Sequence, residues 1–184
     1  TSFQTTIPIG SSDSIFEFGC GCGAFLMPFY DKGHAVGGID YSEVLISIAK
    51  VSMVKADLQL QDVREPSKDK IYDLVLAHSV FHYFESLDFA RTICCKMLKK
   101  SSRKVAILDV PNRLLQKDSE HDRSIAQAGY EVSKSQNEIS HLYYEKQWFE
   151  QFAKEENIDI KIIDQAVDGY INSKYRFNVI MTKL

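Results

Sequence analysis

The sequence has no run of about 20 apolar residues, the length that a membrane-spanning helix needs. It also lacks an excess of basic residues, because 22 lysines and arginines stand against 25 aspartates and glutamates, giving a net charge of −3. Proteins that hold a nucleic-acid backbone usually present a basic face. The start of the chain shows no secretory signal pattern. We therefore expect a cytoplasmic protein with no membrane span and no nucleic-acid partner.

Cysteine is scarce, with four residues in two close pairs, Cys20/Cys22 and Cys94/Cys95. This is not the framework of a disulfide-stabilised secreted domain, and it favours a reducing compartment. A zinc site needs four ligands, which usually come as two spaced pairs. No second pair lies near Cys20 and Cys22, so we expect no metal and interpret these thiols as small side chains in a crowded loop.

Internal repeats, low-complexity tracts and linkers rich in Pro, Gly or Ser are absent as well. The chain has 184 residues, of which 45% are apolar, and this is enough to bury a substantial core. These features predict a single domain that spans residues 1–184. No pattern in the sequence indicates an oligomeric state.

Apolar runs bounded by turn residues predict seven strands, and the run IYDLVLA is typical of a strand buried on both faces. The predicted strands are residues 14–18, 34–39, 51–56, 71–77, 105–110, 158–163 and 175–182. The predicted helices are residues 24–32, 42–50, 86–99 and 144–156. The second helix, capped by Ser42, meets the third strand at Lys50–Val51 with almost no loop. This join indicates either a very tight turn or missing residues.

The alternation of strands and helices predicts right-handed βαβ units in a Rossmann-like, mostly parallel seven-stranded sheet with helices on both faces. Only DQAVDGYINSK separates the last two strands, so the last strand should be antiparallel. Residues 112–143 break the alternation, are polar and hold one short helix near residues 114–122. We expect this segment to form an inserted cover over the carboxyl edge of the sheet.

A glycine-rich loop, Gly19-x-Gly21-x-Gly23, joins the first predicted strand to the first predicted helix. Glycine allows positive φ and the close approach of a ligand to the backbone, and N–H groups at a helix start favour anionic or polar ligand groups. In an open parallel sheet this loop lies at the carboxyl edge, where ligands bind. The loop is therefore predicted to hold a cofactor.

Three acids accompany this loop, each at the end of a predicted strand. Glu17 precedes Gly19 by two residues, and a buried acid is unfavourable unless something pairs with it. Asp40 follows Gly19 by about 20 residues, the spacing at which a carboxylate meets ribose hydroxyls. Asp57 follows the third predicted strand, near the expected position of an adenine ring. Together they predict a nucleoside-containing cofactor.

The motifs FEFGCGCG, GGIDYS, KADL and YDLVLAHSVFHYF resemble the successive motifs of class I S-adenosylmethionine-dependent methyltransferases. The resemblance runs from about residue 14 to residue 184, since the closing YRFNVIMTKL is similar to the final antiparallel strand of that family. Within the family, the chain is similar to the small stand-alone bacterial enzymes often associated with polysaccharide or small-molecule pathways. The resemblance implies methyltransferase activity with S-adenosyl-L-methionine as the cofactor.

The resemblance also implies roles for residues of the first motif. Glu17 matches the acid that orders the loop and meets the methionine amino group of the cofactor, often through water. Gly19, Cys20 and Gly21 match the backbone that passes beneath the cofactor.

Further cofactor contacts are implied in the later motifs. Asp40 matches the ribose-binding acid, and Tyr41 matches the residue beside the adenine. Asp57 and Leu58 match the pair at the adenine edge. His78 matches the strand end whose backbone meets the methionine part of the cofactor.

Two other functions are compatible with the same residues. Gly19-x-Gly21-x-x-Ala24 satisfies the fingerprint of NAD-dependent oxidoreductases, although Glu17 is not part of that fingerprint and the chain beyond the fifth strand is too short for a substrate domain. A non-catalytic S-adenosylmethionine-binding sensor or partner subunit is the second alternative. Cofactor binding without turnover on any acceptor would identify it.

The acceptor is expected to be a small molecule. The Asn-Pro-Pro-Tyr-like run of the protein- and nucleic-acid-modifying subfamilies is replaced by HSVF after the fourth strand. This favours O- or N-methylation of a small molecule, such as a sugar or a polysaccharide precursor.

An oxygen acceptor with a high pKa needs a general base. His82 is the first candidate, because it follows the strand that ends beside the cofactor and an unperturbed histidine pKa of about 6.5 suits the task. His141, in the predicted cover, is the second candidate. The alternative for His82 is a histidine packed among its aromatic neighbours. Asp109, at the end of the fifth strand, either holds the acceptor or caps the turn before Pro111.

Overall fold

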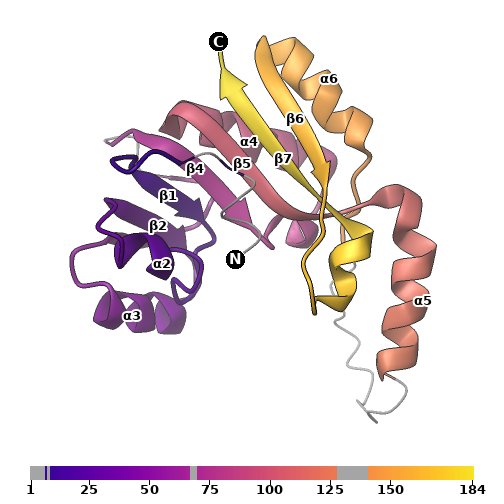
Figure 1. Cartoon of the computed structure of the whole chain (residues 1–184), viewed down its shortest axis with the longest axis horizontal. Helices are drawn as coiled ribbons and strands as arrows, with labels where there is room; N and C mark the ends of the chain where they lie inside the picture. The colour runs from indigo at the N-terminus through magenta and orange to yellow at the C-terminus, as the bar shows by residue number, and fades with distance from the viewer. Residues whose placement is uncertain (1–6, 8, 67–69, 128–140) are drawn as a thin grey trace.

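The computed structural model describes residue 7 and residues 9–66, 70–127 and 141–184. In these residues a seven-stranded sheet forms the centre of the molecule, in the order β3-β2-β1-β4-β5-β7-β6 (Figure 1). The strands are β1 (Ile15–Phe18), β2 (Val36–Asp40), β3 (Asp57–Leu60), β4 (Tyr72–His78), β5 (Ser101–Pro111), β6 (Ile158–Asp164) and β7 (Arg176–Lys183). Neighbours from β3 to β5 pair in parallel, whereas β7 runs antiparallel to both β5 and β6. The predicted Rossmann-like sheet with an antiparallel last strand is confirmed.

Helices lie on both faces of this sheet. The α-helices are α2 (Met27–Tyr30), α3 (Glu43–Ser52), α4 (Leu87–Lys100), α5 (Gln116–Gln127) and α6 (Lys146–Glu156). Short 3-10 turns are η1 (Phe81–Tyr83), η2 (Arg113–Leu115) and η3 (Ile171–Tyr175). Helices α2 and α3 cover β1 and β2 on one face, and α4 lies behind the sheet on the other face (Figure 1).

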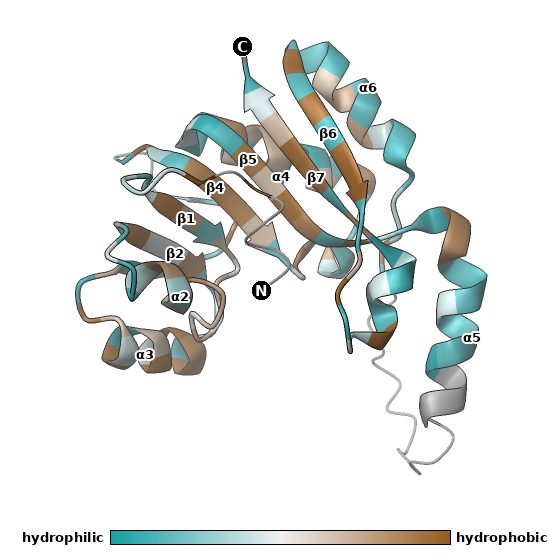
Figure 2. Cartoon of the chain, in the orientation of Figure 1, coloured by the Kyte–Doolittle hydropathy of each residue, from teal (hydrophilic) through white to brown (hydrophobic). Residues whose placement is uncertain are grey.

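Two apolar layers fill the space between the sheet and its helices. Alternate strand residues point to opposite faces, so Phe16 joins the layer beneath α4 and α6, while Ile15 joins the layer beneath α2 and α3. Phe149 of α6 is fully buried in the first layer, and Ile46 of α3 is buried in the second. Figure 2 shows the resulting pattern, with hydrophobic strands in the centre and a hydrophilic α5 at the periphery.

The third strand begins later than the sequence prediction placed it. Residues 51–56 were expected to form that strand, but α3 continues to Ser52 and β3 starts at Asp57. The physical reason is the spacing of Ile46, Ala49 and Met53, which lie on one helical face and are all buried. Lys50 and Val51 therefore lie inside α3, and no tight turn between a helix and a strand is needed there.

The first helix is shorter than predicted. Residues 24–32 were expected to be helical, but only Met27–Tyr30 form α2, after a series of turns. Pro28 in the first turn of α2 has no N–H to donate. The glycine loop is therefore followed by turns and does not lead directly into a helix.

The polar segment after β5 contains a longer helix than expected. A short helix near residues 114–122 was predicted, and α5 extends from Gln116 to Gln127. It is joined to η3 through Asp122, which accepts hydrogen bonds from Lys174 Nζ at 2.9 Å and from Tyr175 Oη at 2.5 Å. Residues 128–140 of the expected cover lie outside the described residues, so the cover remains a prediction.

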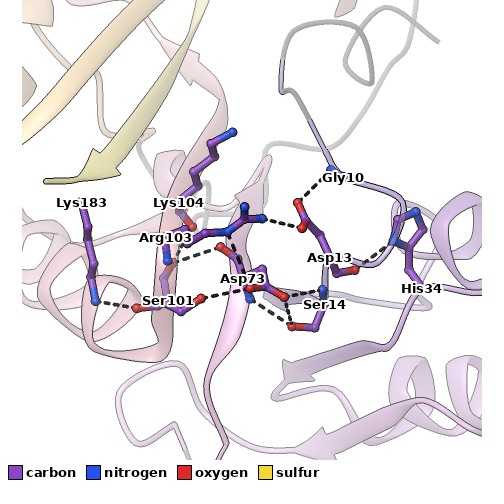
Figure 3. A network of polar contacts seen from close by, with 10 residues as sticks. Gly10, Asp13, Ser14, His34, Asp73, Ser101, Arg103, Lys104 and Lys183 are labelled. Carbon is purple, nitrogen blue, oxygen red and sulfur yellow. Dashed lines mark hydrogen bonds and ion pairs between the residues drawn. The ribbon is translucent and has the colours of Figure 1, made fainter.

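The amino edge of the sheet is joined by a polar network (Figure 3). Asp73, in β4, accepts hydrogen bonds from the backbone N–H and the hydroxyl of Ser14, at 2.9 and 2.8 Å. Arg103, in β5, lies 2.5 Å from Asp13 and 3.6 Å from Asp73. These contacts hold the starts of β1, β4 and β5 together, which leaves the opposite, carboxyl edge available for a ligand.

Candidate active site

The glycine loop leaves β1 in a conformation that requires glycine. Gly19 and Gly21 have φ values of 72° and 52°, in the left-handed region that disfavours a side chain. The N–H groups of Gly19 and Cys20 both donate to the carbonyl of Ile39, at 2.8 and 2.9 Å, which holds the loop against the end of β2. A Cβ on Gly19 would lie 2.6 Å from Val80, whereas one on Gly21 would meet only a Leu45 carbon, at 3.8 Å. The backbone at Gly21 is therefore open to a ligand.

Asp40, the last residue of β2, is held in a fixed orientation beside this loop. Its Oδ2 accepts a hydrogen bond from the Gly21 N–H at 2.8 Å, and its Oδ1 accepts one from the Ser42 N–H at 2.9 Å. The side chain is 7% exposed. Each carboxylate oxygen has a further lone pair, so Asp40 can accept hydrogen bonds from two neighbouring hydroxyls of a ligand.

Glu17 is the most unusual acid in the site, because it is 2% exposed within the interior of β1. Its Oε2 has no hydrogen-bond partner among the described residues. Burial raises the pKa of Glu17 well above its ordinary value, and the nearby charge of Asp40 raises it further. A buried carboxyl without a partner is unfavourable, and a ligand ammonium group would relieve this cost. Glu17 and the open glycine backbone thus fit an amino-acid-bearing nucleoside cofactor.

A cleft of about 730 Å³ lies along the carboxyl edge beside these groups. Of the residues predicted to contact the cofactor, Gly19, Asp40, Tyr41 and His78 line it. Its other lining residues are Ser42, Leu45, Asp62, Val63, Arg64, Ser79, Val80, Tyr83, Phe84, Glu85 and Phe89. A second hollow, of about 570 Å³, lies near the amino ends of β5 and β6 around Cys95 and contains none of the predicted site residues.

The predicted positions of Asp57 and Leu58 are wrong. Asp57 is the first residue of β3 and pairs with Gly37, so it lies toward the amino edge of the sheet, away from the cleft. It accepts a hydrogen bond from Tyr72 Oη at 2.7 Å, and Leu58 is buried in the core. The residues that follow β3 and line the cleft are Asp62 and Val63. The error follows from the misplaced third strand.

The two candidate bases lie next to each other but outside the lining of the cleft. The rings of His82 and His141 are 4.7 Å apart, and the Leu142 N–H donates to the His82 carbonyl at 3.0 Å. Burial, and then the charge of Arg176, lowers the pKa of His82 to about 3. Burial also lowers the pKa of His141, with Arg123 as the next cause. Both rings are therefore neutral and weakly basic at pH 7, and their role as general bases remains a prediction.

A polar cluster at the ends of β4 and β5 completes the region. Ser79 and Asp109 both have positive φ, at 56° and 63°, a strained conformation for residues with side chains. Ser79 Oγ donates to Asp109 Oδ2 at 2.7 Å, and Arg176 Nε lies 3.9 Å from Asp109 Oδ1. The sequence singled out Asp109 from its place at a strand end. It did not single out Arg176, because no local motif marks the start of β7 as part of the site.

Comparison with known proteins agrees with this geometry. Residues 16–106 match the family model of a methyltransferase domain. No curated protein is significantly similar in sequence. The fold is shared by a putative S-adenosylmethionine-dependent methyltransferase from Listeria monocytogenes, at 17% identity over 100% of this chain and 97% of that chain, with a TM-score of 0.75.

Two further structures share the fold. Magnesium protoporphyrin IX methyltransferase from Synechocystis PCC 6803, with bound SAH, is 14% identical over 94% of this chain and 74% of its own, with a TM-score of 0.70. The plantazolicin methyltransferase BpumL, with a triazolic substrate analogue and SAH, is 22% identical over 99% and 80%, with a TM-score of 0.70. Residues 16–106 thus resemble a methyltransferase domain, and the whole chain shares the fold of these S-adenosylmethionine-dependent methyltransferases.

Proposed function

We propose that this protein is a methyltransferase that uses S-adenosylmethionine to methylate an oxygen or nitrogen atom of a small molecule. The observation that carries the cofactor assignment is the buried Glu17 carboxyl, whose Oε2 lacks a hydrogen-bond partner among the described residues. Glu17 lies in β1, just before the glycine loop. The neighbouring strand, β2, ends at Asp40. A cofactor that joins an amino acid to a ribose would give both acids a partner, an ammonium group for Glu17 and hydroxyl groups for Asp40.

The cofactor would be held by residues of the cleft and by Glu17, which is not among the lining residues. Glu17 would pair with its ammonium group, and Asp40 would accept hydrogen bonds from its ribose hydroxyls. Tyr41 and Val63 line the same cleft beyond Asp40 and would contact the adenine. Tyr41 is 82% exposed, so a ring stacked on it would reduce the exposed apolar surface.

When bound, the cofactor supplies a methyl group that is already activated on a sulfonium. The task of the protein is then to hold the acceptor in line with the methyl–sulfur bond and to exclude water, and positioning alone can contribute about 7–11 kcal/mol. His78 ends β4, and Ser79 and Val80 follow it; all three line the cleft and would form its wall near the methionine part. A neutral His82 or His141 would accept a proton only from an acceptor that is already acidic.

The acceptor is proposed to be a small molecule, with a sugar or polysaccharide precursor as one class. The printed names of the two structural relatives refer to a porphyrin and to a plantazolicin precursor, so acceptors differ widely among proteins with this fold. We also propose that residues 1–184 form one methyltransferase domain with residues 112–143 as its cover. The four cysteines are free, in keeping with a reducing, cytoplasmic location.

Two negative findings concern the residues that the structure describes. No helix there is long and apolar enough to cross a membrane. The same ranges contain no group of His, Cys, Asp or Glu residues arranged to hold a metal ion.

Two experiments test this function. Calorimetric titration with S-adenosylhomocysteine should show saturable binding in the parent protein. Incubation with labelled S-adenosylmethionine and a small-molecule extract, followed by mass spectrometry, should then show label in a compound of low molecular mass. Binding without any labelled product would favour the non-catalytic sensor, and the absence of binding would remove the proposal.

A further inference from the structure

Arg176, the first residue of β7, is buried without the partners that a buried guanidinium needs. Its relative exposure is 5%, and neither Nε nor Nη1 has a hydrogen-bond partner among the described residues. The nearest carboxylate oxygen, on Asp109, is 3.9 Å from Nε, which is too far for a hydrogen bond. Buried arginines usually bind carboxylates through two short, parallel hydrogen bonds, so this pair is not the arrangement that a purely structural role would produce.

Asp109 is occupied by other donors. Ser79 Oγ donates to its Oδ2 at 2.7 Å, and Tyr170 Oη donates to the same oxygen at 3.3 Å. Gln165 Nε2 donates to its Oδ1 at 3.2 Å. These contacts hold Asp109 in place while leaving Nε and Nη1 of Arg176 unbonded, although its charge still offsets part of the guanidinium charge.

The groups around Arg176 are mostly cationic or neutral donors. Arg123 Nη1 lies 3.2 Å from His141 Nδ1 and therefore donates to it, and Arg123 Nη2 donates to Tyr143 Oη at 3.4 Å. His82 is 6% exposed, and its Nδ1 has no hydrogen-bond partner in the described part of the chain. The charges of Arg176 and Arg123 both lower the pKa of His82, after burial as the largest cause. The region therefore has unused hydrogen-bond capacity and two arginine charges, with Asp109 as the nearest carboxylate to Arg176.

This region adjoins the cofactor cleft on the side of the methionine part. Ser79 lines the cleft and at the same time donates to Asp109, which lies beside Arg176. His82 belongs to η1, between Phe81 and Tyr83, and Tyr83 lines the cleft. Ser79 therefore connects the cleft to the pair formed by Asp109 and Arg176.

We propose that Arg176 binds a carboxylate of the methyl acceptor, so that the substrate class is a small organic acid. The carboxylate would accept a hydrogen bond from an unbonded nitrogen of the guanidinium, Nε or Nη1, and would pair with its charge. This inference rests on the proposed function, because it assigns the acceptor side of the same site. It concerns how the acceptor is anchored and is independent of which acceptor atom receives the methyl group.

The test uses simple probes in place of the acceptor. The protein is first saturated with S-adenosylhomocysteine, and benzoate, benzamide and phenylphosphonate are then titrated separately by calorimetry. Benzamide has the shape of benzoate without its charge, and phenylphosphonate represents a phosphate-like anion. The variants are Arg176→Gln and Arg176→Lys. The matched control is Arg91→Gln, since Arg91 is a half-exposed arginine of α4 that pairs with Glu155 at 2.7 Å.

The expected result is that benzoate binds the parent about tenfold or more tightly than benzamide, as a buried charge-assisted pair implies. Arg176→Gln should lower benzoate affinity to the benzamide level, and Arg91→Gln should leave it unchanged. Arg176→Lys should retain an intermediate affinity, because it keeps the charge without the fixed N–H directions of the guanidinium. Affinity for S-adenosylhomocysteine should stay within about twofold throughout, since Arg176 does not line the cofactor cleft.

Each other outcome has a defined meaning. Equal affinity for benzoate and benzamide in the parent, or an undiminished preference in Arg176→Gln, would overturn the carboxylate site. Tighter binding of phenylphosphonate than of benzoate would replace the carboxylate with a phosphate-like group. Should Arg176→Gln fail to fold, as loss of S-adenosylhomocysteine binding would reveal, Arg176→Lys decides. Unreduced benzoate affinity in Arg176→Lys would overturn hydrogen bonding by the guanidinium. Failure of the parent to bind S-adenosylhomocysteine contradicts the proposed function and not this site.

Discussion

Glu17→Gln should make the cofactor-free protein more stable, and the gain should grow with pH. Burial raises the pKa of Glu17 in the folded chain well above its ordinary value of 4.5. Above pH 4.5 the unfolded chain loses this proton, whereas the folded chain keeps it. The folded state then binds more protons, so its stability falls as pH rises from 4.5 toward the folded pKa. Below pH 4.5 both states are protonated, and no such loss occurs.

The size of this effect follows from proton linkage. A difference of one bound proton changes the free energy of unfolding by about 1.4 kcal/mol per pH unit. In a protein of this size, 1 kcal/mol corresponds to about 2–4 °C in Tm, so the gap between variant and parent should widen by roughly 3–6 °C per pH unit. Glutamine has no titratable proton, and all other groups titrate equally in both proteins. The gap therefore isolates Glu17.

The assay is differential scanning calorimetry at pH 5, 6 and 7 without cofactor. Asp73→Asn is the matched control, because the Ser14 backbone hydrogen bond lowers the pKa of Asp73 below its ordinary value of 3.8. The stabilisation from Asp73 is complete above pH 3.8, so the gap between that variant and the parent should not change with pH in this range. Saturating S-adenosylhomocysteine should favour the parent, since its ammonium group pairs with an ionised Glu17. A constant gap for Glu17→Gln from pH 5 to 7 would refute the reasoning.

Three further predictions concern Asp40, Asp57 and His82. Asp40→Ala should weaken S-adenosylhomocysteine binding at least roughly tenfold in calorimetry, because hydrogen bonds to a charged group contribute about 1.5–3 kcal/mol; unchanged affinity would remove the ribose assignment. Asp57→Asn should leave that affinity within about twofold while lowering Tm, because Asp57 holds the buried Tyr72 hydroxyl away from the cleft; a large affinity loss would restore Asp57 to the site. NMR titration should find the His82 ring neutral from pH 5 to 8, because its pKa is lowered to about 3, and a titration midpoint near 6.5 would contradict its burial.

The parts of the fold and site that depend on local patterns were predictable from the sequence. Strand and helix periods gave the alternating order up to β5, and the missing helix before β7 indicated its antiparallel direction. Gly19 and Asp40 lie at the ends of adjacent parallel strands, and the sequence places them there directly. Their location in one cleft is consistent with that prediction.

The third strand was misplaced because two signals competed. Val51 and Val54 favour a strand by propensity, but the buried face of Ile46, Ala49 and Met53 continues the helix. The position of every residue after the helix then shifted, so Asp57 was placed at the wrong edge of the sheet. Tertiary packing of that helical face outweighed local propensity.

The Arg176 region was beyond the reach of local patterns. Its parts come from the ends of β4 and β5, from α5 and from the start of β7, which are far apart in the sequence and meet only in the folded sheet. A single arginine before a β-branched strand has no distinctive spacing. Only its burial and its two unbonded nitrogens distinguish it.

The measurement that tests the central claim most directly is the titration of the parent protein with S-adenosylhomocysteine, carried out near pH 7 in two buffers of different ionisation enthalpy. The account predicts saturable binding to one site with release of up to about one proton, because Glu17 ionises when the ligand ammonium group reaches it. The proton release should be absent in Glu17→Gln. A parent protein that shows no saturable binding, or that binds with the same proton balance as Glu17→Gln, would contradict the cofactor site described here.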